Sequence, residues 1–264
     1  MGQLLRQWRE HRRLSQLQLS NEAEISTRHL SFIETGRSAP SRDMILHLAE
    51  HLELPLRERN QLLLAAGFAP LYPESALDSP RMAAVLAAVR QVITAHEPYP
   101  AAVVDRAWNL VDANASIGVF TDGLPVELLT PPVNVLRLTL HPDALAPRIV
   151  NLGELRAHLL SRLRRELDVS ADPALARLYE ELRGYPCDQP APAADAPGRS
   201  DVVVPLRLRY DGGELAFFST VTTFGTALDI TVSELAIESF FPADAATAAA
   251  LRAYADGAGQ PTGG

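Results

Sequence analysis

The chain has 264 residues, 47% of them hydrophobic, which predicts about two globular domains and excludes a disordered protein. A single cysteine, Cys187, excludes an internal disulfide framework and a cysteine-based zinc site, and it favours a reducing compartment. The net charge is −8, yet residues 1–42 hold seven arginines against four glutamates, or +3, which leaves −11 for the rest. The polar start and the lack of an apolar run of about 18 residues predict a cytoplasmic protein that binds no membrane.

Residues 3–68 have helical periodicity and recurrent helix-start signals. Ser15 opens SQLQ, which is a capping box, and Ser26 and Ser41 open two further helices. The turn before Ser26 has about three residues, which favours two helices that cross at a steep angle. Prolines then interrupt the pattern at 69–80. We therefore predict a first domain over 1–70, and a linker with an apolar connecting helix over 71–97.

The stretch EISTRHLSFIETG (24–36) predicts a helix with two distinct faces. At 100° per residue, Leu30 and Ile33 point to one side. Arg28, Ser31, Phe32 and Thr35 point to the other side. A short, polar and basic outer face is typical of a helix that lies in the DNA major groove. An ordinary helical bundle without nucleic acid is the alternative.

Residues 3–66, with the motifs LSQLQLS, ISTRHLSFIETGRSAPS and LAEHLEL, resemble the phage-repressor-type (XRE) helix-turn-helix family. The resemblance implies that Arg9 pairs with Glu34. It also implies a set of DNA-binding residues with different roles. Gln16 would bind a phosphate, the helix that begins at Ser26 would read the bases, and the residues after that helix would contact the DNA backbone. The set comprises Gln16, Ser26, Thr27, Arg28, Ser31, Phe32, Arg37, Ser38 and Arg42. The chain departs from the family pattern at Glu24, where Gly is frequent, and at Ser20, where Ala is frequent.

Several residues of this region allow two interpretations. Arg28 either reads guanine through its two-pronged guanidinium or stays on the solvent or phosphate side. Phe32 either touches a thymine methyl or packs against the loop at 36–40. His47 and His51 have the i, i+4 spacing of metal ligands, but without a third ligand we predict a surface pair and no metal site.

The second half predicts mixed α and β structure. Residues 100–114 alternate as two short strands, 152–167 and 173–184 are helical, and 186–200 form a Pro/Ala-rich loop. The turn DGG (211–213) joins strands 201–210 and 214–224, a third strand region spans 228–241, and a helix follows at 245–256. We read RLRREL (162–167) as a solvated helical face. The predicted fold is thus α + α/β mixed: a five-helix helix-turn-helix domain, then an α+β PAS-like domain (98–255) with an antiparallel sheet, and a disordered tail (256–264).

Residues 98–245 resemble the MmyB-like ligand-binding domain through PYPAAVVDRAWNLVDANAS, NVLRLTLHPDALAPRIVNL and FFSTVTTFGTALDITVSELAIESFFPAD. The resemblance implies a PAS-like fold with a small, largely apolar ligand, and long-chain fatty acids are the expected class. A bound fatty acid would be the sole cofactor-like molecule. An apolar tunnel and a polar head-group site are expected from Val104, Trp108, Asn114, Asn134, Leu136, Arg137, Leu138, His141, Phe217, Val221 and Phe240.

Alternatives stand beside these ligand assignments as well. The apolar members could instead fill a solid core, as most apolar side chains on a sheet face do. Arg137 could pair with Asp105 or Asp112, and Asn114 could cap the helix that follows it.

The sequence favours a DNA-binding transcription regulator and not an enzyme. It contains no Gly-rich phosphate loop, no G-x-S-x-G motif and no metal cluster. We predict a homodimer on a palindromic double-stranded operator, with the second domain sensing a small apolar ligand. The rivals are a second domain that serves only for protein interaction or dimerisation, and an enzyme fused to a regulator.

Overall fold

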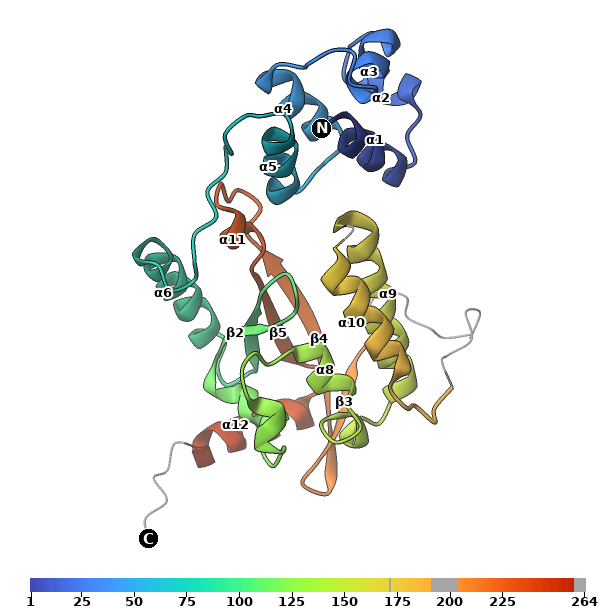
Figure 1. The fold of residues 1–264 in the computed structure, drawn as a ribbon. Helices are drawn as coiled ribbons and strands as arrows, with labels where there is room; N and C mark the ends of the chain where they lie inside the picture. Colours follow the sequence, from blue (N-terminus) through green and yellow to red (C-terminus); the bar gives the residue numbers. More distant parts are fainter. Residues whose placement is uncertain (171, 191–203, 259–264) are drawn as a thin grey trace. The chain divides into compact units, whose positions relative to one another are not determined.

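The computed structural model describes residues 1–170, 172–190 and 204–258, and it divides into two compact units (Figure 1). The first, here called the helical unit, comprises 1–77 together with the distant segment 225–233. The second, here called the sheet unit, comprises the remaining described residues. The prediction of α-helical structure followed by mixed α and β structure with an antiparallel sheet is confirmed.

The helices of the helical unit begin where the sequence places its capping residues. Ser15 forms the predicted capping box with Gln18, and the hydroxyls of Ser26 and Ser41 accept hydrogen bonds from backbone amides in the first turns of their helices. Glu24 takes the left-handed turn conformation, with φ of 51°, in the short connection before Ser26. The bounds are α1 (Gly2–His11), α2 (Gln16–Glu22), α3 (Thr27–Glu34), α4 (Arg42–His51) and α5 (Leu56–Ala65).

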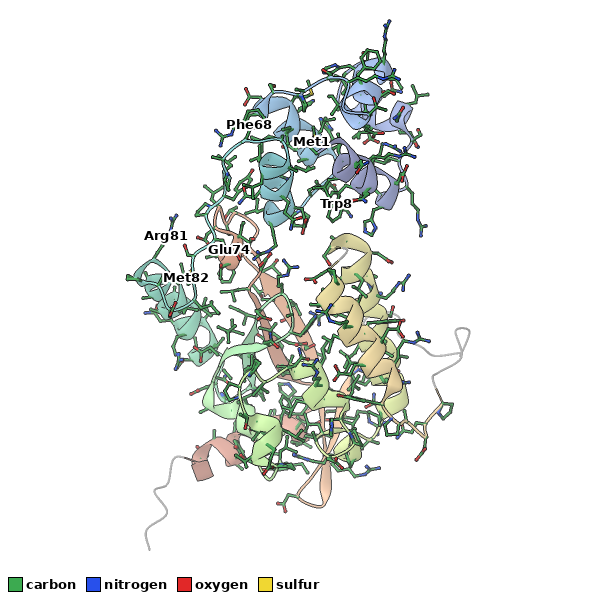
Figure 2. All side chains as sticks on the ribbon, viewed as in Figure 1. Met1, Trp8, Phe68, Glu74, Arg81 and Met82 are labelled. Atoms are coloured by element: carbon green, nitrogen blue, oxygen red, sulfur yellow. The ribbon has the colours of Figure 1, made fainter. Side chains whose placement is uncertain are left out.

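A single hydrophobic core holds these five helices together. Trp8 of α1 points into the unit, where it belongs to the same cluster as Leu19 of α2 and Leu48 of α4 (Figure 2). Leu30 and Ile33 of α3 are fully buried in this cluster, as their helical phase predicts. The inner side of α3 is therefore fixed by packing, and its other side is left for contacts outside the unit.

The chain that follows α5 is tied back to the helical unit. Asn60 of α5 donates to the Tyr72 carbonyl and accepts from the amides of Leu71 and Tyr72. Beyond it, the Ser75 hydroxyl donates to the Asp229 carboxylate at 2.6 Å, and the Ile230 amide donates to the Pro73 carbonyl. These bonds anchor segment 225–233, which contains the short helix α11 (Ile230–Ser233).

The predicted third strand region, 228–241, is therefore wrong at its start. Asp229 accepts a hydrogen bond from the Thr231 amide and opens α11, so the strand begins only at Ala236. Burial by itself would raise the pKa of Asp229. The hydrogen bonds that its carboxylate accepts from Ser75 and from nearby backbone amides outweigh this effect and lower the pKa. A local cap at Asp229 thus outweighs the strand propensity of the residues that follow it.

The sheet unit is built on a five-stranded antiparallel sheet of order β2-β1-β5-β4-β3 (Figure 1). In chain order, its strands are β1 (Ala101–Val104), β2 (Leu110–Ala113), β3 (Leu206–Tyr210), β4 (Gly213–Thr223) and β5 (Ala236–Pro242). Asp211 and Gly212, both with positive φ, form the predicted hairpin turn between β3 and β4. Because the last strand lies between the first and the fourth, β5 comes to the middle of the sheet, with β1 and β4 on either side of it.

Helices surround this sheet. The connecting helix is α6 (Pro80–Thr94), and the predicted helices of the second half are α9 (Leu152–Ser170), α10 (Pro173–Gly184) and α12 (Ala245–Ala258). The crossing from β2 to α9 contains short helices that the sequence did not reveal: η1 (Ala115–Ile117), α7 (Gly118–Thr121), η2 (Val126–Leu129), α8 (Val135–Leu140) and η3 (Ala146–Arg148). Each is too short to display a helical period.

The ends of the predicted elements differ in two places. Residues 256–258, expected in the tail, continue α12, while 259–264 lie outside the described residues. The start of the predicted strand 201–210 also falls partly outside them, as does most of the Pro/Ala-rich loop at 186–200. None of the helices described is long and apolar enough to cross a membrane.

Candidate DNA-binding surface and ligand cavity

The outer side of α3 presents arginine and aromatic side chains. Arg28 is exposed, and its guanidinium carbon lies 5.2 Å from the centre of the Phe32 ring. Arg37, in the loop after α3, approaches the same ring at 5.9 Å. The amides of Arg37 and Ser38 both donate to the Phe32 carbonyl, which folds the loop back on the end of the helix. Phe32 itself is half-buried, so its ring contacts both guanidiniums while one part stays accessible.

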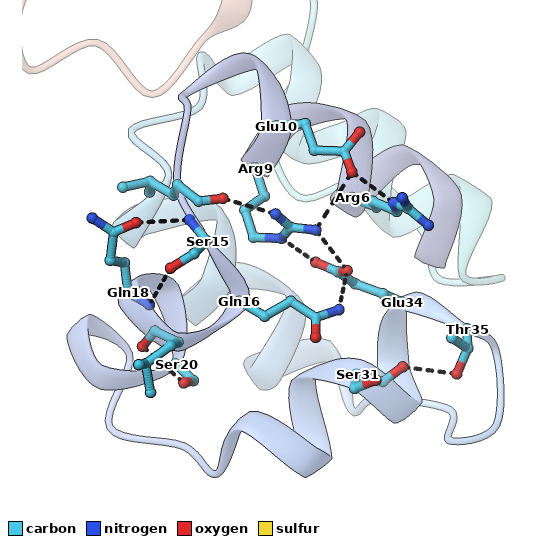
Figure 3. A network of polar contacts seen from close by, with 12 residues as sticks. Arg6, Arg9, Glu10, Ser15, Gln16, Gln18, Ser20, Ser31, Glu34 and Thr35 are labelled. Carbon is cyan, nitrogen blue, oxygen red and sulfur yellow. Dashed lines mark hydrogen bonds and ion pairs between the residues drawn. The ribbon is translucent and has the colours of Figure 1, made fainter.

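An ion pair beneath this surface connects α1 with α3 (Figure 3). Arg9 Nε donates to Glu34 Oε1 at 2.6 Å, and Arg9 Nη2 donates to Glu34 Oε2 at 3.0 Å. The Glu34 side chain is only 1% exposed and that of Arg9 is 8% exposed. The hydrogen bond with Glu34 raises the pKa of Arg9. Gln16 Nε2 donates to Glu34 Oε2 at 2.7 Å, so three helices meet at one carboxylate.

The other predicted DNA contacts fall into two groups. Two hydroxyls make bonds within the helical unit: that of Ser26 caps α3 by accepting from the His29 amide, and that of Thr27 pairs with Ser20 at 2.8 Å. Ser31 takes part through its backbone carbonyl, which accepts from the Thr35 hydroxyl. Arg42, at the start of α4, is exposed, and Ser38 is half-buried. The exposed cationic members are thus the arginines at 28, 37 and 42.

The His47 and His51 side chains behave as a surface pair. Their rings meet edge to face at 4.6 Å, and His47 Nε2 hydrogen-bonds with the Ala23 carbonyl. Within the described part of the chain, no group of three or more His, Cys, Asp or Glu side chains is placed to hold a metal ion.

The sheet unit contains a cavity of about 320 Å³, which is near the lower end of the range of small-molecule sites, about 300–1,000 Å³. Its walls come from the inner face of the sheet, from α7 and α8, and from one side of α9. Most of the lining is aliphatic or aromatic. The side chains from the sheet are Ala102, Val104, Leu110, Leu206, Phe217, Ser219, Glu238 and Phe240, and those from α9 are Leu155, His158, Leu159 and Arg162.

The polar lining includes a half-buried pair of opposite charges. Arg162 Nη1 lies 3.5 Å from Glu238 Oε1, and the Glu238 side chain is 14% exposed. Ser219 donates to the same Glu238 oxygen at 3.1 Å. Burial raises the pKa of Glu238 despite the nearby guanidinium. Burial also lowers the pKa of His158, and Arg162 and Arg165 add to the shift, so His158 is neutral at pH 7.

Five of the side chains predicted for the ligand tunnel line this cavity: Val104, Leu136, Leu138, Phe217 and Phe240. Trp108 and Val221 are not among the lining residues. Trp108 is buried under the guanidinium of Arg162 at 4.2 Å and donates from Nε1 to Glu166, whereas Val221 is 41% exposed. Five of the seven apolar side chains predicted for the tunnel thus lie in the cavity lining, and their contact with a ligand stays a prediction.

The polar residues predicted for the head group point elsewhere. Asn134 caps α8 by accepting from the Arg137 amide, and it donates to the Ala107 carbonyl. Arg137 forms a two-bond ion pair with Glu181, a partner that neither sequence interpretation named. His141 packs against the ring of Tyr185. These side chains have local partners on the helices, which removes them from the cavity lining.

Asn114 also has a role that differs from the predicted cap. Its side chain makes no capping bond to the helix that follows. Instead, its oxygen accepts from the Ala101 amide, and its nitrogen donates to the carbonyls of Ile93 and Tyr99. It fixes the start of β1 to the end of α6.

The polar residues that do line the cavity were missed in the sequence, although a signal for them exists. His158 and Arg162 lie on the same side of α9 as Leu155 and Leu159, following the i, i+3, i+4, i+7 spacing of a buried stripe. The interpretation of residues 162–167 as a solvated face is thus wrong for Arg162. Glu238 shares the inner face of β5 with Phe240, as strand alternation requires.

The two units together define a class of protein: a helix-turn-helix DNA-binding unit followed by a PAS-like unit that encloses a cavity. Comparison with known families gives the same division, because residues 1–62 match a helix-turn-helix domain and residues 85–253 match the MmyB-like transcription regulator ligand binding domain. The second match covers more than half of the chain, so the protein belongs to the MmyB-like transcription regulators. It is a DNA-binding transcription regulator with a ligand-binding domain. A search of the curated proteins found no match.

Proposed function

We propose that this regulator binds a palindromic operator as a homodimer and that a fatty acid in the cavity changes its affinity for DNA. The observation that carries the proposal is the cavity itself, which is lined by apolar side chains and has a few polar groups. Such a lining suits a molecule with a long apolar tail and one small polar head. A solid core would have favoured a protein-interaction module instead.

Arg28 is the side chain that we propose as the main base reader. It is exposed on α3, and its contact with Phe32 restricts its motion and aims its fork away from the core. A bidentate contact with guanine contributes about 1–3 kcal/mol of discrimination. Arg28→Ala is therefore expected to lower the affinity for the operator by about 5- to 150-fold and to change the affinity for random DNA far less.

Fluorescence anisotropy with operator and scrambled duplexes at one salt concentration measures the loss of affinity for each duplex. Arg42→Ala is the matched control, because an exposed arginine on the phosphate side should weaken both duplexes alike. Equal losses on both duplexes for Arg28→Ala would remove its role as a reader.

Segment 225–233 offers a covalent route from the cavity to the DNA-binding unit. It joins β4 to β5, the two strands that carry Phe217, Ser219, Glu238 and Phe240 into the cavity. The same segment packs within the helical unit through Asp229. A ligand that shifts β4 against β5 therefore pulls on a segment anchored beside α5. It can shift the regulator only if its affinity differs between the two states.

Lipid extraction and native mass spectrometry of the purified protein test the ligand. We expect a bound fatty acid, or a rise in melting temperature when fatty acid is added to stripped protein. The same addition should change the affinity for operator DNA. If no acyl compound copurifies, and neither melting temperature nor DNA affinity responds, the second unit acts without a ligand. The oligomeric state that light scattering finds on a two-half-site duplex tests the homodimer.

A further inference from the structure

Carboxylates outnumber cations in the charged cluster that consists of Arg162 and Glu238 in the cavity lining and Glu166 next to them. Arg162 serves two carboxylates, since its Nε lies 3.4 Å from Glu166 Oε1 and its Nη1 lies 3.5 Å from Glu238 Oε1. Glu166 also accepts the Trp108 Nε1 bond at 2.8 Å, which fixes it beside the guanidinium. With both carboxyls ionised, these three charged groups sum to −1. The cavity is therefore not prepared to receive a free carboxylate.

The groups around Glu238 add no further positive charge. From α9, Arg162 pairs with it, His158 lines the same cavity, and Glu166 acts on it from one turn further along that helix. The remaining contacts are uncharged, because Ser219 comes from β4 and Ala102 lies opposite Glu238 on β1. His158 is neutral at pH 7, as described above. A second carboxylate beside Glu238 would thus meet a like charge in an apolar cavity.

Two carboxyl groups that share an apolar site do not both ionise, and one of them keeps a proton. We propose that an acidic ligand binds together with one proton, which its carboxyl group shares with Glu238. The guanidinium of Arg162, which pairs with Glu238 in the free protein, then faces the pair formed by the two carboxyl groups. This inference rests on the proposed function and names its chemistry: a monocarboxylic acid with an apolar tail, whose binding takes up a proton. The ion pair between Arg162 and Glu238 is then the element that the ligand replaces.

The sign of the pH dependence follows from this exchange. Above about pH 6, a free fatty acid is ionised, because ordinary carboxyl groups titrate near pH 4. The complex holds one proton that the separated partners lack once Glu238 is also ionised. The affinity is therefore constant below the pKa of Glu238 in the free protein, and above it falls by about tenfold per pH unit. A ligand with the same tail and no carboxyl group should show no such fall.

The test is calorimetric titration of the full-length protein, stripped of lipid, with decanoic acid and with decanol between about pH 6 and about pH 9. Two buffers of different ionisation enthalpy report the number of protons taken up and need no mutation. For decanoic acid we expect uptake approaching one proton at the alkaline end, and at least about tenfold weaker binding there than at the acid end. For decanol we expect neither effect.

Glu238→Gln keeps the size of the side chain and its hydrogen bond with Ser219, but its amide neither ionises nor takes up a proton. It should bind decanoic acid at every pH without the slope, and circular dichroism verifies its fold. The inference is overturned if the wild-type protein binds the acid without proton uptake. It is also overturned if the slope persists in Glu238→Gln, which would assign the proton to His158, or if decylamine binds more tightly than the acid. Failure of both the acid and the alcohol to bind would overturn the proposed function, and this inference with it.

Discussion

Replacing Arg9 with methionine is expected to destabilise the helical unit by about 3–5 kcal/mol, because it leaves a charged and buried Glu34 without its guanidinium partner. Gln16 would remain as a donor to Glu34, but a neutral amide compensates a buried carboxylate only in part. The measurement is urea denaturation followed by the fluorescence of Trp8, which is 5% exposed in the core of that unit. Trp108→Phe in all variants removes the other tryptophan signal.

Arg6→Met is the matched control for this experiment. Arg6 lies on the same helix and pairs with Glu10, but both side chains are more than half exposed, at 61% and 51%. Exposed pairs of this kind contribute little to stability, because water and salt screen them, so the control should unfold almost as the parent does. Adding Glu34→Leu to Arg9→Met should recover much of the lost stability, because it removes the unpaired charge. Equal losses for Arg9→Met and Arg6→Met would show that the buried pair does not hold α1 to α3.

Filling the cavity is expected to separate ligand binding from DNA binding. Ala102 lies on β1, is 5% exposed and lines the cavity beside Val104. The ring of Ala102→Phe would occupy space that a ligand needs, so that a ligand could enter only by displacing packed side chains, which costs about 1–3 kcal/mol. We therefore expect the affinity for decanol to fall by about 5- to 150-fold. Decanol is chosen because its binding should not depend on the protonation of Glu238.

The control is Ala84→Phe, the same change at an exposed position of α6. It should leave ligand affinity unchanged. Both variants should bind operator DNA with the parent affinity when no ligand is present, because both positions belong to the sheet unit. Only Ala102→Phe should lose the response of DNA binding to ligand. Normal ligand affinity in a folded Ala102→Phe protein would place the ligand outside this cavity and contradict the proposed site.

The helical unit was predictable because its signals are local. A capping serine and the amides that it binds are three residues apart or fewer, and the helical period of Leu30 and Ile33 is visible within one short segment. The hairpin at Asp211 and Gly212 was found for the same reason. The pairing of Arg9 with Glu34 spans 25 residues and came from the family resemblance, not from any local rule.

The sequence by itself determined the capped helices of the first unit, the hairpin and the longer helices of the second half, and the apolar character of Val104, Phe217 and Phe240, because these depend on patterns within a few residues. Only the tertiary structure decided which polar side chains face the cavity. Arg137 looked suitable within its apolar run, yet Glu181, 44 residues away, holds it. Arg162 was interpreted as part of a solvated face and Glu238 was not singled out, yet they meet in the cavity because strand order and helix packing bring together segments 76 residues apart. Such partners are fixed by the whole fold, and no window of the sequence contains both.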